Sequence, residues 1–184
     1  MYLWEGWGLY LGTPLWARPL VGTREPTGGL SPRLPSGTMS RPDPERLAVW
    51  RSFLEAHAAI TQTLAAELEA ERSLPLGWYD VLLTLHEAGG RLRMHELAGR
   101  LLVNKSSLTR LIDRMTDAGY VEREPCLEDG RGQYAVLTRE GRDTLRRAAP
   151  THLRGVQEHF AQYLTDSDVV ALARVFGKLA GAER

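Results

Sequence analysis

Residues 105–114 combine short hydroxyl and cationic side chains of the kind that bind nucleic acid. The run reads KSSLTRLIDR, and its apolar members Leu108, Leu111 and Ile112 recur at three- and four-residue steps, as the buried stripe of a helix does. The hydroxyls and cations left on the outer face are Lys105, Ser106, Ser107, Thr109, Arg110 and Arg114. Such groups bond phosphates and base edges, and a helix N-terminus adds amide donors and a positive dipole. The pattern predicts a DNA-contacting face, while an ordinary solvated face is the alternative.

This helix is the second of a pair that we predict within residues 91–120. Asn104 can cap it through its side-chain oxygen, and Gly119 can end it in a left-handed conformation. A shorter apolar stripe before it, at the same helical spacing, consists of Met94, Leu97, Ala98, Leu101 and Leu102. Two helices joined by a tight turn form a helix-turn-helix, whose second helix enters the major groove of DNA.

Composition restricts the ways in which the chain could bind DNA. Its 184 residues carry no net charge, with 23 basic and 23 acidic side chains, so attraction to DNA depends on local charge. Between Arg91 and Arg114 there are six basic residues against two acids, Glu96 and Asp113. The single cysteine, Cys126, excludes an intramolecular disulfide and a Cys-rich zinc cluster. Because the sequence has neither a membrane-spanning apolar run nor a secretory signal, we expect a soluble, cytoplasmic protein.

The first 42 residues differ in character from the rest. Seven glycines and six prolines interrupt every periodic pattern there, which predicts a disordered extension. Alternatively, Met39 is the true start and residues 1–38 are not translated. Residues 43–184 form the predicted folded domain, with dimerisation helices at about 43–72 and 138–181 and a DNA-binding lobe at about 76–137.

The expected elements follow from local signals. Asp43 and Pro44 start a helix that runs to about Arg72, and its two apolar stripes suggest packing against a partner chain as well as its own. A second helix follows Pro75 and closes at Gly89-Gly90. Residues 121–126 and 133–138 resemble the strands of a hairpin. Thr138 caps a long helix that Pro150 should kink or split, and Thr165 starts the last helix.

In this order the sequence resembles the multiple-antibiotic-resistance-regulator (MarR) family of winged-helix transcription factors. The matching words are WYDVLLTL, RLRMHELAGRLLVNKSSLTRLIDRM, GYVER and DGRGQYAVLTREGR. The resemblance covers about residues 43–181 and implies a mainly α fold, with an α-helical dimerisation region and a small β-wing. It also implies a homodimer that binds a pseudo-palindromic operator, usually represses a nearby promoter, and releases DNA when a small aromatic or phenolic molecule binds.

The resemblance assigns roles to residues of the wing as well as the recognition helix. Arg131 matches the arginine of the wing tip, which enters the minor groove, and Asp129 matches an acid that orients it. Gly130 stands where the family often has a second arginine. With four acids in residues 122–131, this departure predicts weaker wing contacts and a shallower salt dependence.

An effector site is also implied by the resemblance. Its expected lining residues are Trp50, His57, Tyr79, Asp80 and Arg123. In relatives that sense urate, a tryptophan, an aspartate and two arginines form the sensing set, and Asp80, Arg110 and Arg123 fall at comparable positions. The alternatives are that Asp80 forms a buried ion pair with Arg110 or Arg123 and that Trp50 is a core residue.

Other chemistry has less support in the sequence. His152 and His159 are two helical turns apart, too far for one metal ion unless other ligands converge, so we predict no metal site and no cofactor. Acids beside Cys126 should disfavour its thiolate. No nucleophile with a plausible base is suggested, so we do not expect an enzyme. The alternative functions are a dimer acting through protein–protein contacts and a redox- or metal-responsive regulator.

Overall fold

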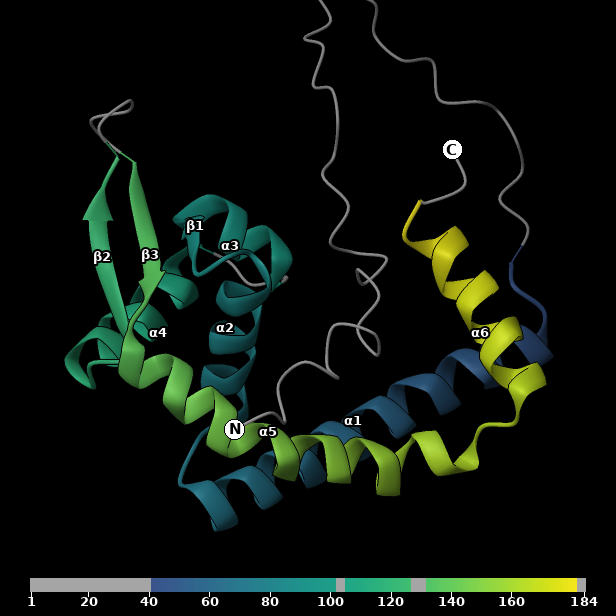
Figure 1. Cartoon of the computed structure of the whole chain (residues 1–184). Coiled ribbons are helices and arrows are strands. Elements are labelled where there is room, and N and C mark those ends of the chain that lie inside the picture. The colour runs from purple at the N-terminus through teal and green to yellow at the C-terminus, as the bar shows by residue number, and fades with distance from the viewer. Residues whose placement is uncertain (1–40, 102–104, 127–131, 182–184) are drawn as a thin grey trace, which may run out of the picture. The chain divides into compact units, whose positions relative to one another are not determined.

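A computed structural model describes residues 41–101, 105–126 and 132–181 of the chain (Figure 1). Predictions made for the N-terminal extension, for the Asn104 cap and for the wing-tip residues Asp129 and Arg131 lie outside these residues. The elements, in order, are α1 (Pro44–Arg72), α2 (Leu76–Glu87), β1 (Arg91–Arg93), α3 (Met94–Arg100), α4 (Lys105–Asp117), β2 (Val121–Pro125), β3 (Gln133–Leu137), α5 (Arg139–His159), a short 3-10 helix (Ala161–Tyr163) and α6 (Asp166–Leu179). The mainly helical fold with a small sheet is the one predicted. No helix in the described ranges has the length and apolarity required to cross a membrane.

The starts of α1, α5 and α6 have the local capping groups that were predicted for them. The backbone N–H of Arg46 donates to Asp43 Oδ1 at 2.8 Å at the start of α1. At α5, the N–H of Gly141 donates to Thr138 Oγ1 at 3.0 Å. At α6, the N–H of Thr165 donates to Asp168 Oδ2 at 2.9 Å, and Asp168 returns its own N–H to the Thr165 hydroxyl. Each signal lies within three residues of the helix it starts.

Helix α5 departs from the prediction at Pro150. The helix runs without a break through this residue to His159, so of the two predicted outcomes, a kink or a split, the split is wrong. Proline costs a helix interior about 3 kcal/mol because it removes one N–H and its ring crowds the preceding turn. The neighbours Ala148, Ala149 and Thr151 are all buried, whereas Pro150 itself faces solvent. Packing of these buried neighbours is a stabilising contribution that can offset such a cost.

The chain divides into two compact units. The larger, residues 57–172, contains the sheet and the helices α2 to α5. Its three strands lie in the order β1-β3-β2, all antiparallel, with Leu92 opposite Ala135 and Arg123 opposite Ala135 on the other side. The fully buried apolar side chains of this unit include Leu68, Leu82, Leu85, Leu97, Leu108, Ile112, Met115 and Val121.

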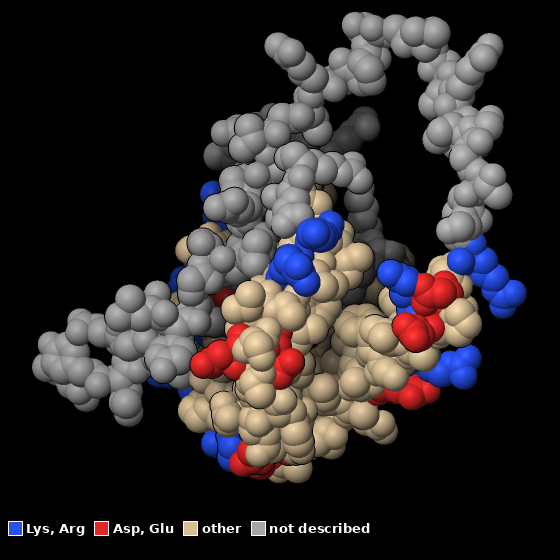
Figure 2. Space-filling view, turned by 90° about the vertical axis from the view of Figure 1, so that its right-hand side faces the viewer, with Lys and Arg blue, Asp and Glu red and all other residues tan. Residues whose placement is uncertain are grey.

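The smaller unit consists, in the described part, of residues 41–56, which include the first half of α1, and residues 173–181, which include the end of α6. Its aromatic rings contact one another: Trp50 stacks on Phe53 at 5.9 Å between ring centroids, and Phe53 meets Phe176 at 6.2 Å. Much of its apolar surface remains exposed, namely Leu47, Val49, Trp50, Phe53, Leu54, Val175, Phe176 and Leu179. Figure 2 views the side of Figure 1 on which α6 is drawn, and uncharged residues cover most of the described surface there.

Candidate nucleic-acid interface

Helix α4 presents one buried and one exposed face. Leu108, Ile112 and Met115 are buried beneath it, while the hydroxyls and cations predicted to contact DNA lie on the other side. The exposed members are Ser106, Ser107, Thr109, Arg110 and Arg114; the side chain of Lys105 lies outside the description. Because Ser106 and Ser107 occupy the first turn, the helix dipole and its orphan amide groups add to the attraction for an anion there.

Strand β1 joins the β2–β3 hairpin to the helix-turn-helix. Strand β1 lies immediately before α3 and pairs with β3, which in turn pairs with β2 (Figure 1). At the C-terminal end of α4, Gly119 takes the left-handed conformation, with φ of 77°, and the N–H of Tyr120 donates to the carbonyl of Met115 at 2.9 Å. The chain therefore turns directly from α4 into β2, which places the hairpin beside the recognition helix.

Arg123 links the hairpin to α4 through its guanidinium group. Nη2 donates to Asp113 Oδ1 at 2.7 Å and to the carbonyl oxygen of Thr109 at 3.2 Å, and Nη1 donates to Gln133 Oε1 at 2.7 Å. The side chain is 23% exposed, so it is partly shielded from solvent. This residue was predicted to bind an effector or to pair with Asp80, but its partner is Asp113. It also neutralises the acid nearest to Arg110 and Arg114 on α4.

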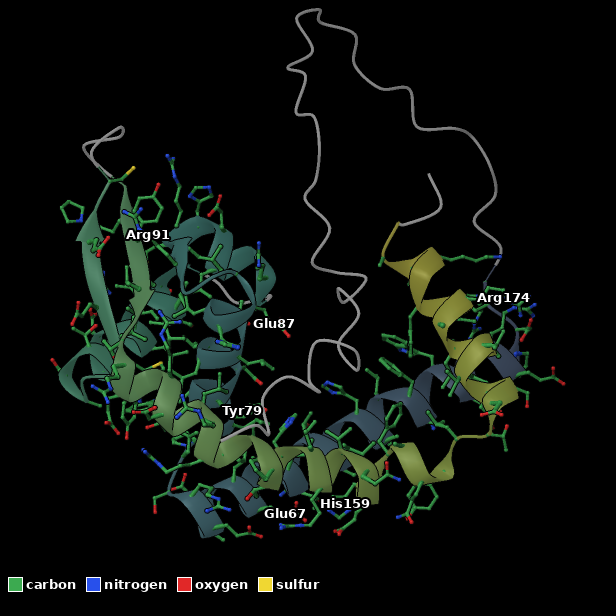
Figure 3. The ribbon with its side chains drawn as sticks, in the orientation of Figure 1. Glu67, Tyr79, Glu87, Arg91, His159 and Arg174 are labelled. Atoms are coloured by element: carbon green, nitrogen blue, oxygen red, sulfur yellow. The ribbon has the colours of Figure 1, made fainter. Side chains whose placement is uncertain are left out.

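A second cationic cluster lies across β1 and the hairpin. The guanidinium of Arg91 lies 3.7 Å from the ring centroid of Tyr134 and forms an ion pair with Glu124 at 3.1 Å. Arg93 Nε donates to the Tyr134 hydroxyl at 3.2 Å. These contacts connect β1 to both strands of the hairpin, and Glu124 of β2 orients the guanidinium of Arg91. Arg91 is labelled in Figure 3.

The residues expected to bind an effector have separate environments. Tyr79 is 2% exposed and stacks on His152, 4.4 Å between ring centroids, which sequence reasoning missed because it considered His152 only beside His159. Burial raises the pKa of Asp80 to about 6. His57 is exposed on α1. Trp50, in the other unit, is 57% exposed, so the core role weighed for it is not seen in this chain.

Burial also shifts the pKa of two further polar side chains, His152 and Glu87. Burial lowers the pKa of His152, and its Nδ1 atom has no hydrogen-bond partner among the described residues. At the end of α2, burial likewise raises the pKa of Glu87, and one of its carboxylate oxygens lacks a partner in the described part of the chain. Both residues lie in the larger unit, and burial disfavours the charged form of each.

The comparisons with known proteins agree with this architecture. A family model described as the MarR family matches residues 72–132, which contain the helix-turn-helix and the hairpin. The structure is similar to AbsC, a MarR family transcriptional regulator from Streptomyces coelicolor, with 34% identity and a TM-score of 0.71 over 78% of this chain and 97% of that one. It is also similar to Sco3205, a MarR family transcriptional regulator from the same organism solved in complex with DNA, with 34% identity and a TM-score of 0.72 over 79% and 92%.

A third solved structure shares the fold at lower identity. It belongs to a study of how 6-hydroxynicotinic acid regulates DNA binding by BpsR of Bordetella bronchiseptica. The match has 16% identity and a TM-score of 0.64, and it covers 72% of this chain and 98% of that one. No curated protein matches the chain.

Proposed function

Because the chain belongs to the MarR family of transcriptional regulators, we propose that it is a homodimeric repressor that binds a pseudo-palindromic operator in double-stranded DNA. The observation that carries this proposal is the exposed face of α4. Ser106, Ser107, Thr109, Arg110 and Arg114 project from a helix whose opposite face is buried. A relative with 34% identity over most of its length was solved in complex with DNA.

Dimerisation is supported by the smaller unit. Its aromatic and aliphatic side chains leave an apolar surface that a soluble monomer would rarely expose. A second copy offers the same surface about a two-fold axis, which is the commonest way in which identical chains associate. Two copies of α4 would then read two similar half-sites, so the operator should mirror the symmetry of the dimer.

An effector that is a small aromatic or phenolic acid fits the chemistry near Tyr79. The tyrosine ring, the stacked imidazole of His152 and the partly buried carboxyl of Asp80 offer apolar contact with a few polar groups. DNA binding by BpsR, which shares the fold, is regulated by 6-hydroxynicotinic acid. We infer that an effector of this class would alter the packing of α2 against α5 and release the DNA.

The test is a fluorescence-anisotropy titration of the full chain against duplexes from its own upstream intergenic DNA, with a scrambled duplex of equal length as control. We expect selective binding that weakens as salt rises, because cations on α4 displace counterions from phosphates. A panel of phenolic and hydroxylated aromatic acids is then added to the complex. Equal affinity for both duplexes at low salt, from a folded dimer, would contradict the proposal and favour a regulator that acts through protein contacts.

A further inference from the structure

Three potential metal ligands converge where the C-terminal half of α1 lies along α5. They are Glu67 from α1 and the adjacent Glu158 and His159 from α5, and one ligand atom from each lies within 4.8 Å of the others. His159 Nε2 and Glu67 Oε1 are 2.6 Å apart. Figure 3 labels Glu67 and His159 close together on these two helices. Sequence reasoning excluded a metal here because His152 and His159 are too far apart, but the ligands that join His159 come from other positions.

The carboxylate of Glu67 lies in a space that the backbone keeps open. A Cβ atom on Gly155 would come within 2.6 Å of Glu67 Oε2 and 2.5 Å of Leu64 Cδ2, so a larger residue here would require the ends of both side chains to move. Glu67 Oε2 is buried and has no hydrogen-bond partner among the described residues. A buried carboxylate oxygen without a partner is costly unless a cation or donor satisfies it.

The charges around the cluster also favour a cation. Arg154 forms an ion pair with Glu71, and its Nε lies 3.9 Å from Glu158 Oε1. Arg72 Nε donates to the Thr151 hydroxyl at 3.0 Å, which in turn donates to Glu71. The acids Glu67, Glu71 and Glu158 therefore outnumber the guanidinium groups of Arg72 and Arg154. Since Arg154 keeps Glu71 as a partner, Glu158 can turn toward an ion without leaving that arginine unpaired.

We propose that Glu67, Glu158 and His159 bind a divalent first-row transition-metal ion, for which Zn²⁺ is the probe. One imidazole nitrogen and two carboxylate oxygens are a ligand set suited to such ions, and a water molecule completes four-coordination. Ligand atoms of one Zn²⁺ lie at about 2.0–2.2 Å from it and hence at most ~4 Å apart. To reach that range, the three side chains would have to close by rotation about their terminal torsions. Glu158 is exposed, which leaves a route from solvent.

A bound ion would join α1 to α5 and stabilise the larger unit, because the folded chain gathers ligands that the unfolded chain holds 92 residues apart. Metal binding also displaces the hydrogen bond between His159 and Glu67. This inference is independent of DNA binding and can be tested in its absence.

The experiment is a competition between the metal-free full chain and a chromophoric zinc chelator at neutral pH. The variants are Glu158→Gln, which changes an exposed side chain, and His159→Ala; His95→Ala, an exposed histidine on α3, is the matched control. We expect one Zn²⁺ per parent chain, unchanged affinity in His95→Ala, and affinity at least about tenfold weaker in both cluster variants. Circular dichroism checks that each variant is folded, and Zn²⁺ should raise the Tm of the parent but not of Glu158→Gln.

Equal zinc affinity in the parent and in folded Glu158→Gln would overturn the proposal, as would failure of the parent to compete with the chelator at micromolar Zn²⁺. Co²⁺ provides a second readout, since inner-sphere binding by imidazole and carboxylates produces visible absorption bands. Those bands should appear with the parent and the His95→Ala control and be lost in His159→Ala. Bands that persist in His159→Ala would place the ion elsewhere and contradict this site.

Discussion

At the scale of single residues, the exposed face of α4 carries the cations Arg110 and Arg114 beside the acids Asp113 and Asp117. Asp113 is bound by Arg123 at 2.7 Å, so its carboxylate is screened from a phosphate that approaches Arg110 or Arg114. We predict that Arg123 affects DNA binding only indirectly, through its contacts with Thr109 and Asp113 on α4. Truncation of an exposed cationic side chain such as Arg110 or Arg114 to alanine should lower the affinity for DNA much more than the stability of the fold.

Arg110→Ala should weaken binding to the preferred operator by about 1–3 kcal/mol and reduce discrimination between operator and scrambled DNA, because a groove-facing cation is lost. Fluorescence anisotropy with both duplexes measures the two effects. Arg146→Ala is the control, since Arg146 pairs with Asp143 on the surface of α5. Parent-like affinity in folded Arg110→Ala would remove this residue from the interface.

Asp80 should make stability depend on pH. Burial raises its pKa from 3.8 to about 6, so between these values the folded chain binds more protons than the unfolded chain. The favourable contribution of the protonated carboxyl is complete below 3.8 and is lost as pH rises through about 6. Asp80→Asn stays neutral throughout, so its free energy of unfolding relative to the parent should increase between pH 4 and pH 7.

The size of that increase follows from the shift of about two pKa units. It corresponds to at most about 3 kcal/mol, and partial solvent access of the carboxyl should reduce it. Urea denaturation of both proteins across this pH range measures the difference. A constant difference between variant and parent would show that Asp80 does not titrate with a raised pKa in the folded chain.

At the scale of elements, the sequence predicted the start of a helix wherever that start depends on residues close by in the chain. Asp43, Thr138 and Thr165 cap their helices through groups three residues away, so their positions were predictable from the sequence alone. The split predicted at Pro150 is wrong, and the burial of the neighbouring Ala148 and Ala149 depends on tertiary packing that the local sequence does not show. The amphipathic face of α4 was predictable from periodicity alone.

Contacts between elements were not predictable in the same way. Arg123 meets Asp113 only because Gly119 turns β2 back along α4, and His159 meets Glu67 across 92 residues because α1 lies along α5. From the sequence we considered only Asp80 as a partner for Arg110 or Arg123, and we did not predict the ion pair between Arg123 and Asp113. To identify such side-chain partners the packed structure is needed, because the residue types alone allow several different ion pairs.

Thr138 joins two elements and should be costly to truncate. Its hydroxyl accepts the N–H of Gly141 and lies 2.8 Å and 3.0 Å from the carbonyl oxygens of Gly119 and Tyr120, to which it can donate. Thr138→Ala should lower the free energy of unfolding by about 1–2 kcal/mol, because the α5 cap and the tie to the end of α4 are both lost. Thr138→Ser retains the hydroxyl and should recover most of the loss in urea denaturation; equal destabilisation of both variants would contradict the capping role.

At the scale of the whole molecule, the exposed apolar side chains of the smaller unit should determine the oligomeric state. Val49→Glu introduces a charge on this surface and should shift the chain from dimer toward monomer in sedimentation velocity, because a buried unpaired charge opposes association. Ala118→Glu, an exposed apolar position after α4 in the other unit, is the matched control and should remain dimeric. Dimers of equal stability in both variants would place the interface elsewhere.

The family that the sequence resembles is the one that the relatives show. It could be identified because the segments of the helix-turn-helix and of the hairpin are contiguous in the chain. We predicted that two apolar stripes on the first helix would pack against its own domain and a partner chain. Members of both stripes lie exposed on α1, namely Leu47, Val49, Trp50, Phe53 and Leu54, and packing against a partner remains a prediction. The division of the chain into dimerisation and DNA-binding parts at residues 72 and 138 remains a prediction, since the compact units in the structure have other boundaries.

The central claim is that a dimer places two copies of α4 in successive major grooves on one side of the DNA, and hydroxyl-radical footprinting of the complex tests it most directly. The account predicts two protected regions related by a two-fold axis and centred about 10–10.5 base pairs, or one helical turn, apart. Arg110→Ala should weaken both regions equally. A single protected region, or protection that does not depend on sequence, would contradict the claim.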